Sequence, residues 1–238
     1  MVTSGSRSEA AQVQIVRTTP SVAPERLFAH RRCYMGISLD NPVFRGESLK
    51  DLVAWALAHF DQCLIIVGDT LRRFNETMLH GLAEGEAAAA AEELGREFLD
   101  GAGAWLEGFA PDRLTVLRWR ACLELPEFPA ARQTLDRLYA ADAAFRAGVQ
   151  RDAHAFIKRQ KRHGRPFAVD EERALALSCN YLLEEIAEFS VLSQRGWTVE
   201  LYPGPELGVL VDIARGCFDG IPVGLKQRIN VELRHRKG

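Results

Sequence analysis

The feature that most constrains the fold of this chain is a short apolar run at residues 63–67, CLIIV, which lies between two longer helical patterns. A strand without polar residues is buried on both faces, as in a parallel sheet whose two sides are covered by helices. Directly before this run, apolar residues recur every three or four positions over 49–60, the spacing of an amphipathic helix. The alternation predicts an α/β fold with a mainly parallel sheet flanked by helices.

The same alternation continues along the rest of the chain. Ser48 resembles a capping-box start for the helix at 49–60, and Pro203 ends a strand because proline cannot donate to the ladder. The long helical stretch that begins at Phe128 is expected to break near Gly148. The further strands that we expect are 12–16, 33–37, 114–119, 197–202 and 227–233. The further helices that we expect are 71–79, 84–106, 128–163, 169–192 and 206–215.

Length and composition favour one domain in the cytoplasm. Residues 1–12 are small and polar and are expected to form a flexible tail, which leaves a single domain at 13–238. No apolar run approaches the roughly 18 residues of a membrane span. The five cysteines are scattered and never in C-x-x-C spacing, which is typical of reduced thiols inside cells.

The charge balance restricts the partners. Thirty basic and 32 acidic residues leave a net charge of −2, which excludes a uniformly basic nucleic-acid binder but is compatible with a local basic patch. The six histidines lack the spacing of metal ligands, so we expect no metal site.

Ser38 is the first candidate for chemistry. It follows the expected strand 33–37, and ligands in open α/β sheets bind beyond the carboxyl ends of strands. The surrounding sequence is not a G-x-S-x-G elbow, because Asp40 stands where the second glycine would be. The alternative interpretation is a polar turn whose side chains satisfy nearby backbone groups.

Two further candidates lie late in the chain. Tyr181, Glu185 and Glu188 share one face of a predicted helix, where a phenol and a carboxylate one turn apart could hold a substrate ammonium. The alternative is a solvated acidic face. Tyr202 lies at the end of an expected strand, where a structural role would be the ordinary one.

Taken together, these groups indicate a family. A G-I-S-x-x-N loop around Ser38, a Tyr181-x-x-x-Glu185 pair and a late-strand Tyr202, in this order, resemble the cyclodipeptide synthases over about residues 25–235. The resemblance implies a Rossmann-like fold related to the catalytic domain of class Ic aminoacyl-tRNA synthetases. It also implies that the aminoacyl groups of two aminoacyl-tRNAs are joined into a diketopiperazine. The reaction would need no ATP, cofactor, DNA or membrane. In agreement, the chain has no Walker-type phosphate loop.

The resemblance also implies roles for individual residues. Ser38 would carry first an aminoacyl and then a dipeptidyl group in a ping-pong reaction, while Tyr181 and Glu185 hold the α-amino group of the bound residue. Tyr202 would assist the later steps. The group that accepts the Ser38 proton is not identified by the sequence.

Two more residues of the motif concern the loop and the branch of the family. Gly36 would keep the backbone close to the acyl group, and Asn41 would order the loop. Pro203, directly after the late tyrosine, resembles the branch of the family that has proline there, whereas Asn41 is typical of the other branch. We favour the proline branch because the Tyr-Pro step adjoins the site.

Substrate identity is predicted less directly. By the resemblance, four residues fall near the pocket for the first aminoacyl group: Tyr34, Trp119, Glu188 and Glu200. Two bulky aromatics there suggest a small residue such as alanine, although both could equally be core aromatics. The basic residues around 158–165 could favour an acidic second residue, so the expected product is cyclo(Ala-Glu).

The tRNA-binding surface departs from the resemblance. Better-known members carry a basic patch on the helix that corresponds to 84–107, yet this segment has seven acidic residues and one arginine. Phosphate contacts should supply much of the affinity for tRNA. The alternative interpretation of the nearest basic cluster is a helix end whose cations complement the helix dipole. The candidate cations are Lys158, Arg159, Lys161, Arg162 and Arg165, with Arg234, Arg236 and Lys237 at the end of the chain.

Two other functions stay open at this point. A serine hydrolase or simple acyltransferase would act on small esters without tRNA and would need a histidine base that the sequence does not place. A non-catalytic tRNA- or nucleotide-binding module would bind RNA without forming product. The complete set of Ser38, Tyr181, Glu185 and Tyr202 argues against such a degenerate relative.

Overall fold

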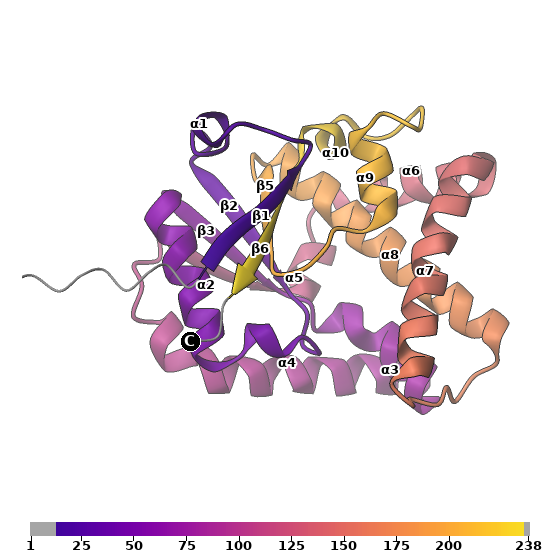
Figure 1. The fold of residues 1–238 in the computed structure, drawn as a ribbon. Helices are drawn as coiled ribbons and strands as arrows, with labels where there is room; N and C mark the ends of the chain where they lie inside the picture. Colours follow the sequence, from indigo (N-terminus) through magenta and orange to yellow (C-terminus); the bar gives the residue numbers. More distant parts are fainter. Residues whose placement is uncertain (1–12, 236–238) are drawn as a thin grey trace, which may run out of the picture.

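The computed structural model describes residues 13–235, in which helices surround one central sheet (Figure 1). The predicted tail at 1–12 lies outside the described residues, as do Arg236 and Lys237. In the described part of the chain, no helix is both long enough and apolar enough to span a membrane.

Six strands form the sheet, in the order β1-β6-β5-β2-β3-β4. Every neighbouring pair is parallel except β1 and β6 at one edge, which are antiparallel. The predicted α/β fold with a mainly parallel sheet is therefore confirmed. The strands are β1 Val13–Thr19, β2 Arg32–Ile37, β3 Gln62–Val67, β4 Leu114–Arg118, β5 Val199–Tyr202 and β6 Ile229–His235.

The strand order places a topological switch between β2 and β5. From β2 the chain adds β3 and β4 on one side, whereas the later strands β5 and β6 lie on the other side. Loops that leave the carboxyl ends of β2 and β5 therefore diverge and open a crevice, the usual ligand site in such sheets. Across this junction Tyr34 of β2 is in register with Glu200 of β5.

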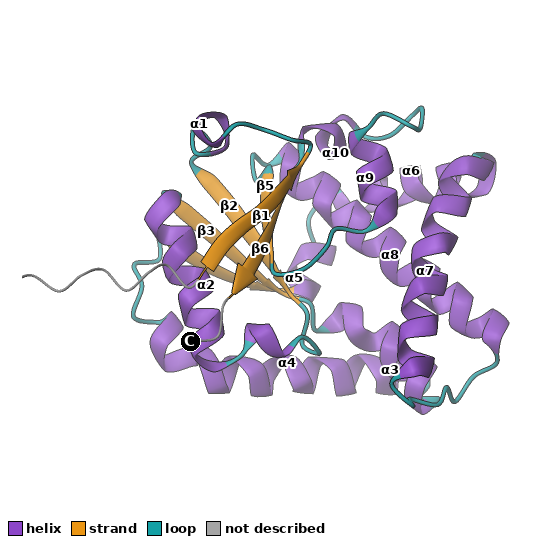
Figure 2. Cartoon of the chain, viewed as in Figure 1, coloured by secondary structure: helices purple, strands orange, loops and turns teal. Residues whose placement is uncertain are grey.

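Helices cover both faces of the sheet (Figure 2). Tyr34, Leu64 and Ile66 face a core formed with α5 to α10, while Cys33 and Ile65 face a second core formed with α2 and the end of α4. This two-sided burial explains the wholly apolar sequence of β3. The longer helices are α2 Gly46–His59, α3 Arg73–His80, α4 Glu84–Leu106, α6 Phe128–Ala141, α7 Ala143–Arg162 and α8 Glu171–Gln194. The short helices are α1 Pro24–Leu27, α5 Trp119–Leu123, α9 Gly208–Ala214 and α10 Val223–Gln227, with 3-10 turns η1 Pro42–Phe44 and η2 Thr70–Arg72.

Several local predictions were wrong for identifiable reasons. The break in the 128–163 helix lies at Asp142, whose carboxylate accepts hydrogen bonds from the backbone N–H of Ala144 (2.8 Å) and Phe145 (3.1 Å) and so begins α7. Gly148 lies inside α7, where it lets Val209 of α9 approach closely. Helix α2 begins at Gly46, before Ser48, without a side-chain cap.

A buried aspartate joins the sheet to α4 and α5. Asp69 accepts hydrogen bonds from the backbone N–H of Thr70 (2.7 Å) and Trp119 (3.1 Å), and from Arg118 Nε (2.5 Å). The strand predicted at 114–119 therefore ends at Arg118, and Trp119 starts α5. Helix α4 crosses directly over this aspartate at Gly95, where a Cβ atom would lie 2.4 Å from Asp69.

Candidate functional site

The loop that carries Ser38 leaves the carboxyl end of β2 at the switch point. Ser38 is half-buried, and its carbonyl oxygen accepts a hydrogen bond from the Asn41 N–H (3.0 Å). The Asn41 side chain accepts a hydrogen bond from the Val43 N–H (3.1 Å) and so begins η1. Arg45 donates to the Leu39 carbonyl oxygen (3.1 Å), so both ends of the loop are held.

Three other predicted residues meet at this loop. Tyr181 and Glu185 lie one turn apart on α8, and Tyr202 ends β5, the strand beside β2. Burial raises the pKa of Tyr181 well above its ordinary value, and the nearby charges of Glu185, Tyr202 and Asp40 add to the effect. Burial also raises the pKa of Tyr202, which the adjoining Asn41 amide opposes. The structure thus brings together groups from β2, β5 and α8 that are distant in sequence.

Glu185 is a carboxyl group with an unusual pKa. Burial raises the pKa of Glu185 to about 8, the neighbouring Glu200 contributes to the rise, and Arg228 opposes it. At neutral pH the protonated acid is therefore favoured, and a cation beside Glu185 would favour the carboxylate. This is the electrostatic behaviour that an ammonium-binding carboxyl needs.

Below the Ser38 loop, the sheet leaves space at Gly36. Gly36 and Tyr34 point to the same face of β2, because side chains alternate along a strand. A Cβ atom at Gly36 would have no other atom within 4 Å, whereas Tyr34 is fully buried and its ring lies 5.9 Å from that of Phe189 on α8. The glycine therefore opens room between the Ser38 loop and a floor that contains Tyr34.

An arginine that the sequence analysis did not single out organises this floor. Arg228 is 5% exposed, donates to the Tyr34 hydroxyl from Nε (3.1 Å), and forms ion pairs with Glu200 and Glu206 through its two terminal nitrogens. Asn230 also donates to Glu200 (3.3 Å). The only sequence signal is an arginine directly before an apolar strand, and it does not reveal partners as far away as Tyr34.

Trp119 and Glu188 lie in a different cluster. The Trp119 indole donates to Glu184 (2.9 Å), which also pairs with Arg73 (2.5 Å). Glu188 is fully buried beside the Cys122 thiol, with no hydrogen-bond partner for either carboxylate oxygen among the residues that the structure describes. Burial raises the pKa of Glu188 to about 7. The assignment of these two residues to the pocket for the first aminoacyl group stays a prediction.

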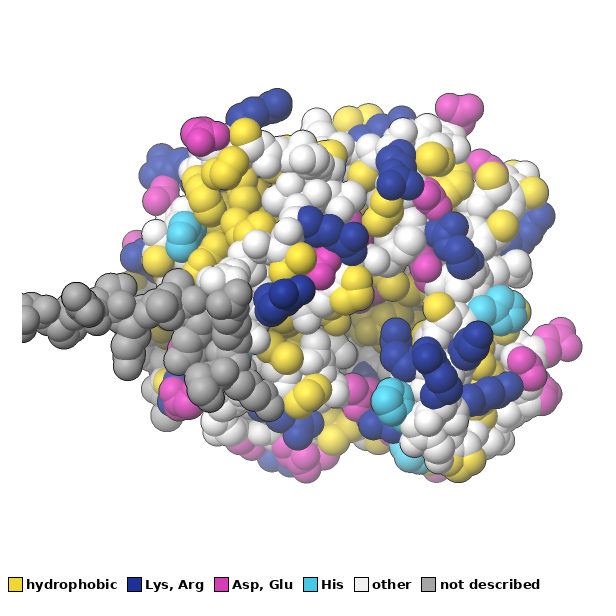
Figure 3. All heavy atoms as spheres, in the orientation of Figure 1, with side chains coloured by type: hydrophobic (Ala, Val, Ile, Leu, Met, Phe, Trp, Pro, Cys, Tyr) yellow, Lys and Arg dark blue, Asp and Glu magenta, His cyan; other side chains and the backbone are white. Residues whose placement is uncertain are grey.

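The predicted basic cluster lies at the exposed end of α7. Figure 3 shows Lys and Arg side chains gathered there beside a hollow in the surface. Arg159 lies 5.5 Å above the Phe156 ring, and its positive charge opposes the rise that burial causes in the pKa of Tyr202. Lys161 pairs with Glu171 across a distance of 3.2 Å. The cluster therefore adjoins the Tyr202 side of the site.

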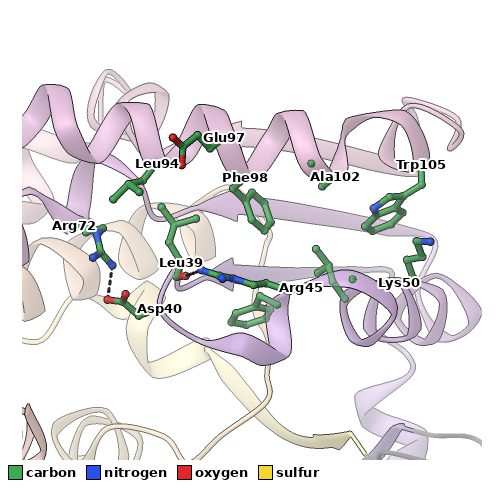
Figure 4. Close-up of a pocket in the computed structure, with 14 residues that line it drawn as sticks. Leu39, Asp40, Arg45, Lys50, Arg72, Leu94, Glu97, Phe98, Ala102 and Trp105 are labelled. Atoms are coloured by element: carbon green, nitrogen blue, oxygen red, sulfur yellow. Dashed lines mark hydrogen bonds and ion pairs between the residues drawn. The ribbon is translucent and has the colours of Figure 1, made fainter. Parts of the chain in front are cut away.

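A groove of about 610 Å³ runs from the Ser38 loop along α4 (Figure 4). At its inner end Asp40 forms an ion pair with Arg72. Aromatic and basic side chains line the rest of it together with one further acid, Glu97. The labelled groups on its two walls are Leu39, Arg45, Lys50, Leu94, Phe98, Ala102 and Trp105. Within residues 13–235, no group of three or more His, Cys, Asp or Glu side chains is arranged to hold a metal.

A doubly wound sheet whose polar groups meet at the switch between β2 and β5 defines a Rossmann-like α/β protein. The family model for cyclodipeptide synthase matches residues 21–190. The chain belongs to this family, whose members are enzymes, and the resemblance inferred from the sequence is confirmed. The subdivision by Pro203 stays a prediction.

Solved structures have the same fold. A cyclodipeptide synthase from Fluoribacter dumoffii is 22% identical with a TM-score of 0.78, over 90% of this chain and 94% of that one. One from Candidatus Glomeribacter gigasporarum, bound to Phe-tRNAPhe, is 16% identical with a TM-score of 0.63, over 87% and 89%.

A Mycobacterium tuberculosis protein relates this fold to the tRNA synthetases. It is 16% identical with a TM-score of 0.71, over 94% of this chain and 92% of that one, and its structure is described as relating cyclodipeptide synthetases to type I tRNA synthetases. A search of curated proteins found no match.

Proposed function

We propose that this enzyme joins two aminoacyl groups, each delivered by an aminoacyl-tRNA, into a cyclodipeptide through acyl intermediates on Ser38. The observation that carries the proposal is the meeting of Tyr181, Glu185 and Tyr202 around the Ser38 loop at the switch point. A relative of the same family has been solved with Phe-tRNAPhe bound, which supports aminoacyl-tRNA as the substrate class. The ester of an aminoacyl-tRNA is already activated, so the reaction requires neither ATP nor a cofactor.

The first step is transfer of the aminoacyl group to Ser38. The serine oxygen attacks the ester carbonyl, the bond to the ribose oxygen breaks, and the proton of the serine hydroxyl passes to the departing ribose oxygen. Tyr181 and Glu185 bind the α-ammonium and hold the acyl carbon near the serine. The space at Gly36 receives the side chain of the bound residue.

The second step lengthens the acyl group while it stays on Ser38. For this to occur, the amine of the serine-bound residue must attack the ester of the second aminoacyl-tRNA and release that tRNA. The ammonium first has to lose a proton, and Glu185, with a pKa of about 8, is matched to accept it. The new terminal amine then attacks the Ser38 ester, which closes the ring and returns a proton to the serine oxygen. Tyr202 lies where it can assist these two transfers.

The tRNA is proposed to dock over the end of α7. Lys158, Arg159 and Arg162 are exposed there, and Arg159 lies on the side of Tyr202. In contrast, the one arginine of α4, Arg96, is paired with Glu93 and Asp100. The groove begins at Leu39 and Asp40, directly after Ser38, and offers aromatic faces and cations farther along, which suits the unpaired 3′ end of a tRNA.

Mass spectrometry of the product tests the proposal. Wild-type protein supplied with a mixture of charged tRNAs is expected to form a diketopiperazine; cyclo(Ala-Glu) is the product predicted from the sequence. Ser38→Ala should abolish it, whereas the matched variant Ser48→Ala, in the next helix, should retain it. Intact-mass analysis should detect an aminoacyl adduct on the wild type and none on Ser38→Ala.

Two other outcomes would favour the other functions. Turnover of small activated esters without tRNA would indicate a hydrolase or simple acyltransferase. RNA binding without adduct or product would indicate a non-catalytic binding module.

A further inference from the structure

Beneath Glu185 lies a buried charge cluster whose charges do not balance. Arg228 bridges Glu200 of β5 and Glu206 of the following loop, and all three side chains are almost fully covered. The third guanidinium nitrogen of Arg228 is bonded to Tyr34, and the group lies 4.7 Å above the ring of Phe189, one turn beyond Glu185 on α8. Every nitrogen of Arg228 is therefore occupied by the protein itself.

We propose that Arg228 is a positioning residue that holds Glu200 and Glu206 near Glu185. The carboxyl groups of the site then outnumber its cations, and the substrate α-ammonium supplies the missing positive charge. This inference rests on the proposed function and extends it to residues outside the motif. Counting Glu185, three carboxyl groups share one guanidinium. Burial disfavours an unpaired charge, so the cluster retains a proton until substrate binds and then exchanges it for the ammonium.

The charged groups around Glu185 support this arrangement. Glu200 faces it from β5 and disfavours its ionisation, while Arg228, from the segment before β6, opposes that effect. Tyr181 on α8 and Tyr202 at the end of β5 are the other titratable neighbours; phenols are neutral near pH 7, and burial raises the pKa of both further. The balance at Glu185 is thus set by Glu200 and Arg228.

The cluster also selects against two kinds of donor. Arg228 already pairs with two buried carboxylates and bonds to Tyr34, so a substrate carboxylate would have to compete with these partners, and Glu200 adds negative charge beside Tyr34. An acidic first residue is therefore disfavoured, and an acyl group without a free ammonium cannot complete the cluster. The cluster thus discriminates aminoacyl from N-acetylaminoacyl donors.

The test measures formation of the Ser38 adduct in a single turnover between pH 6 and 8.5, for wild type, Glu200→Gln and Arg228→Met. Removal of the Glu200 charge should lower the pH midpoint by about one unit or more, and removal of the Arg228 charge should raise it. A merely structural role predicts slower reaction in both variants with an unchanged midpoint. Glu184→Gln, a buried carboxyl-to-amide change in the separate cluster at Trp119, should leave the midpoint unchanged.

A second readout uses N-acetylaminoacyl-tRNA as the donor. We expect wild type to discriminate against it by about 100-fold or more, and Glu200→Gln to reduce that ratio at least tenfold. If Arg228→Met does not fold, Glu200→Gln alone decides the matter. If the wild type forms the adduct but Glu200→Gln has the same pH midpoint as Glu184→Gln, the inference is overturned and the proposed function stays intact. Absence of any adduct in the wild type would instead overturn the proposed function.

Discussion

At the scale of single residues, glycine serves two purposes in this chain: it leaves free space at one position and allows close packing at another. Gly36 leaves room between the Ser38 loop and the floor of the site, whereas Gly95 lets α4 lie directly on Asp69. Gly36 belongs to the motif around Ser38, whereas no sequence pattern marks Gly95, and the structure shows space beside the first and close contact at the second. The neighbouring atoms therefore decide what each glycine does.

Gly95 provides a test of this contact. We expect Gly95→Ala to lower the free energy of unfolding by about 1–3 kcal/mol, the usual cost of overpacking. A Cβ atom there would lie 2.4 Å from the Asp69 side chain, which is held in place by Thr70, Arg118 and Trp119. Urea unfolding monitored by circular dichroism measures the change.

Another glycine of the same helix is the control. Gly101 is exposed, and a Cβ atom at this position would have no other atom within 4 Å. Gly101→Ala should therefore raise stability by up to about 1 kcal/mol through helix propensity. Equal effects of the two substitutions would show that α4 does not press on Asp69.

At the scale of elements, helix propensity and apolar spacing predicted most of the secondary structure, because these signals are local. The bounds 84–106 agree with α4, and the apolar run 63–67 lies within β3. The break between α6 and α7 was misplaced because Gly148 serves close packing, while Asp142 caps the helix. The sequence carries both residues but not the tertiary contact that separates their roles.

The opposite charges of α4 and α7 lead to a prediction on RNA binding. Charge reversal at Lys158, Arg159 and Arg162 to glutamate should weaken tRNA binding by about tenfold or more and flatten its dependence on salt, because fewer phosphate contacts release fewer counterions. Filter binding between about 50 and 200 mM salt measures both effects.

The matched control reverses three cations elsewhere on the surface. Arg31, Arg137 and Arg215 are exposed and lie outside α7, so their change to glutamate should have a smaller effect. Unchanged binding in the α7 variant would place the RNA on another face.

At the scale of the whole molecule, the site depends on strand order, which no local pattern encodes. The motifs predicted Ser38, Tyr181, Glu185 and Tyr202 as members of one site, but only the position of β5 beside β2 brings three elements to one switch point. Arg228 and Tyr34, 194 residues apart, meet for the same reason. A network made of such pairs has no signature in one sequence.

The buried carboxyl groups on α8 also make global stability depend on pH. The pKa of Glu188 is raised from an ordinary 4.5 to about 7, so the folded protein binds a proton more tightly than the unfolded chain. The cost of ionising Glu188 is therefore absent below about pH 4.5, grows as the pH rises and is fully present above about pH 7. We expect wild-type stability to fall between about pH 5 and pH 8.

Glu188→Gln should remove this part of the slope. The variant keeps the shape of the side chain without its charge, and at pH 8 it should be more stable than wild type by up to roughly 3 kcal/mol, with little difference at pH 5. Urea unfolding at the two pH values decides the point. Glu185→Gln, whose parent carboxyl has a pKa raised from 4.5 to about 8, should show a gain of the same sign that begins at the same pH and continues to grow up to about pH 8. Parallel stability curves for wild type and Glu188→Gln would mean that the Glu188 carboxyl is solvated in solution. In that case the pH dependence of folding would originate at the candidate site, where the charge of Arg228 acts on Glu185, and the core beside Cys122 would contribute nothing to it.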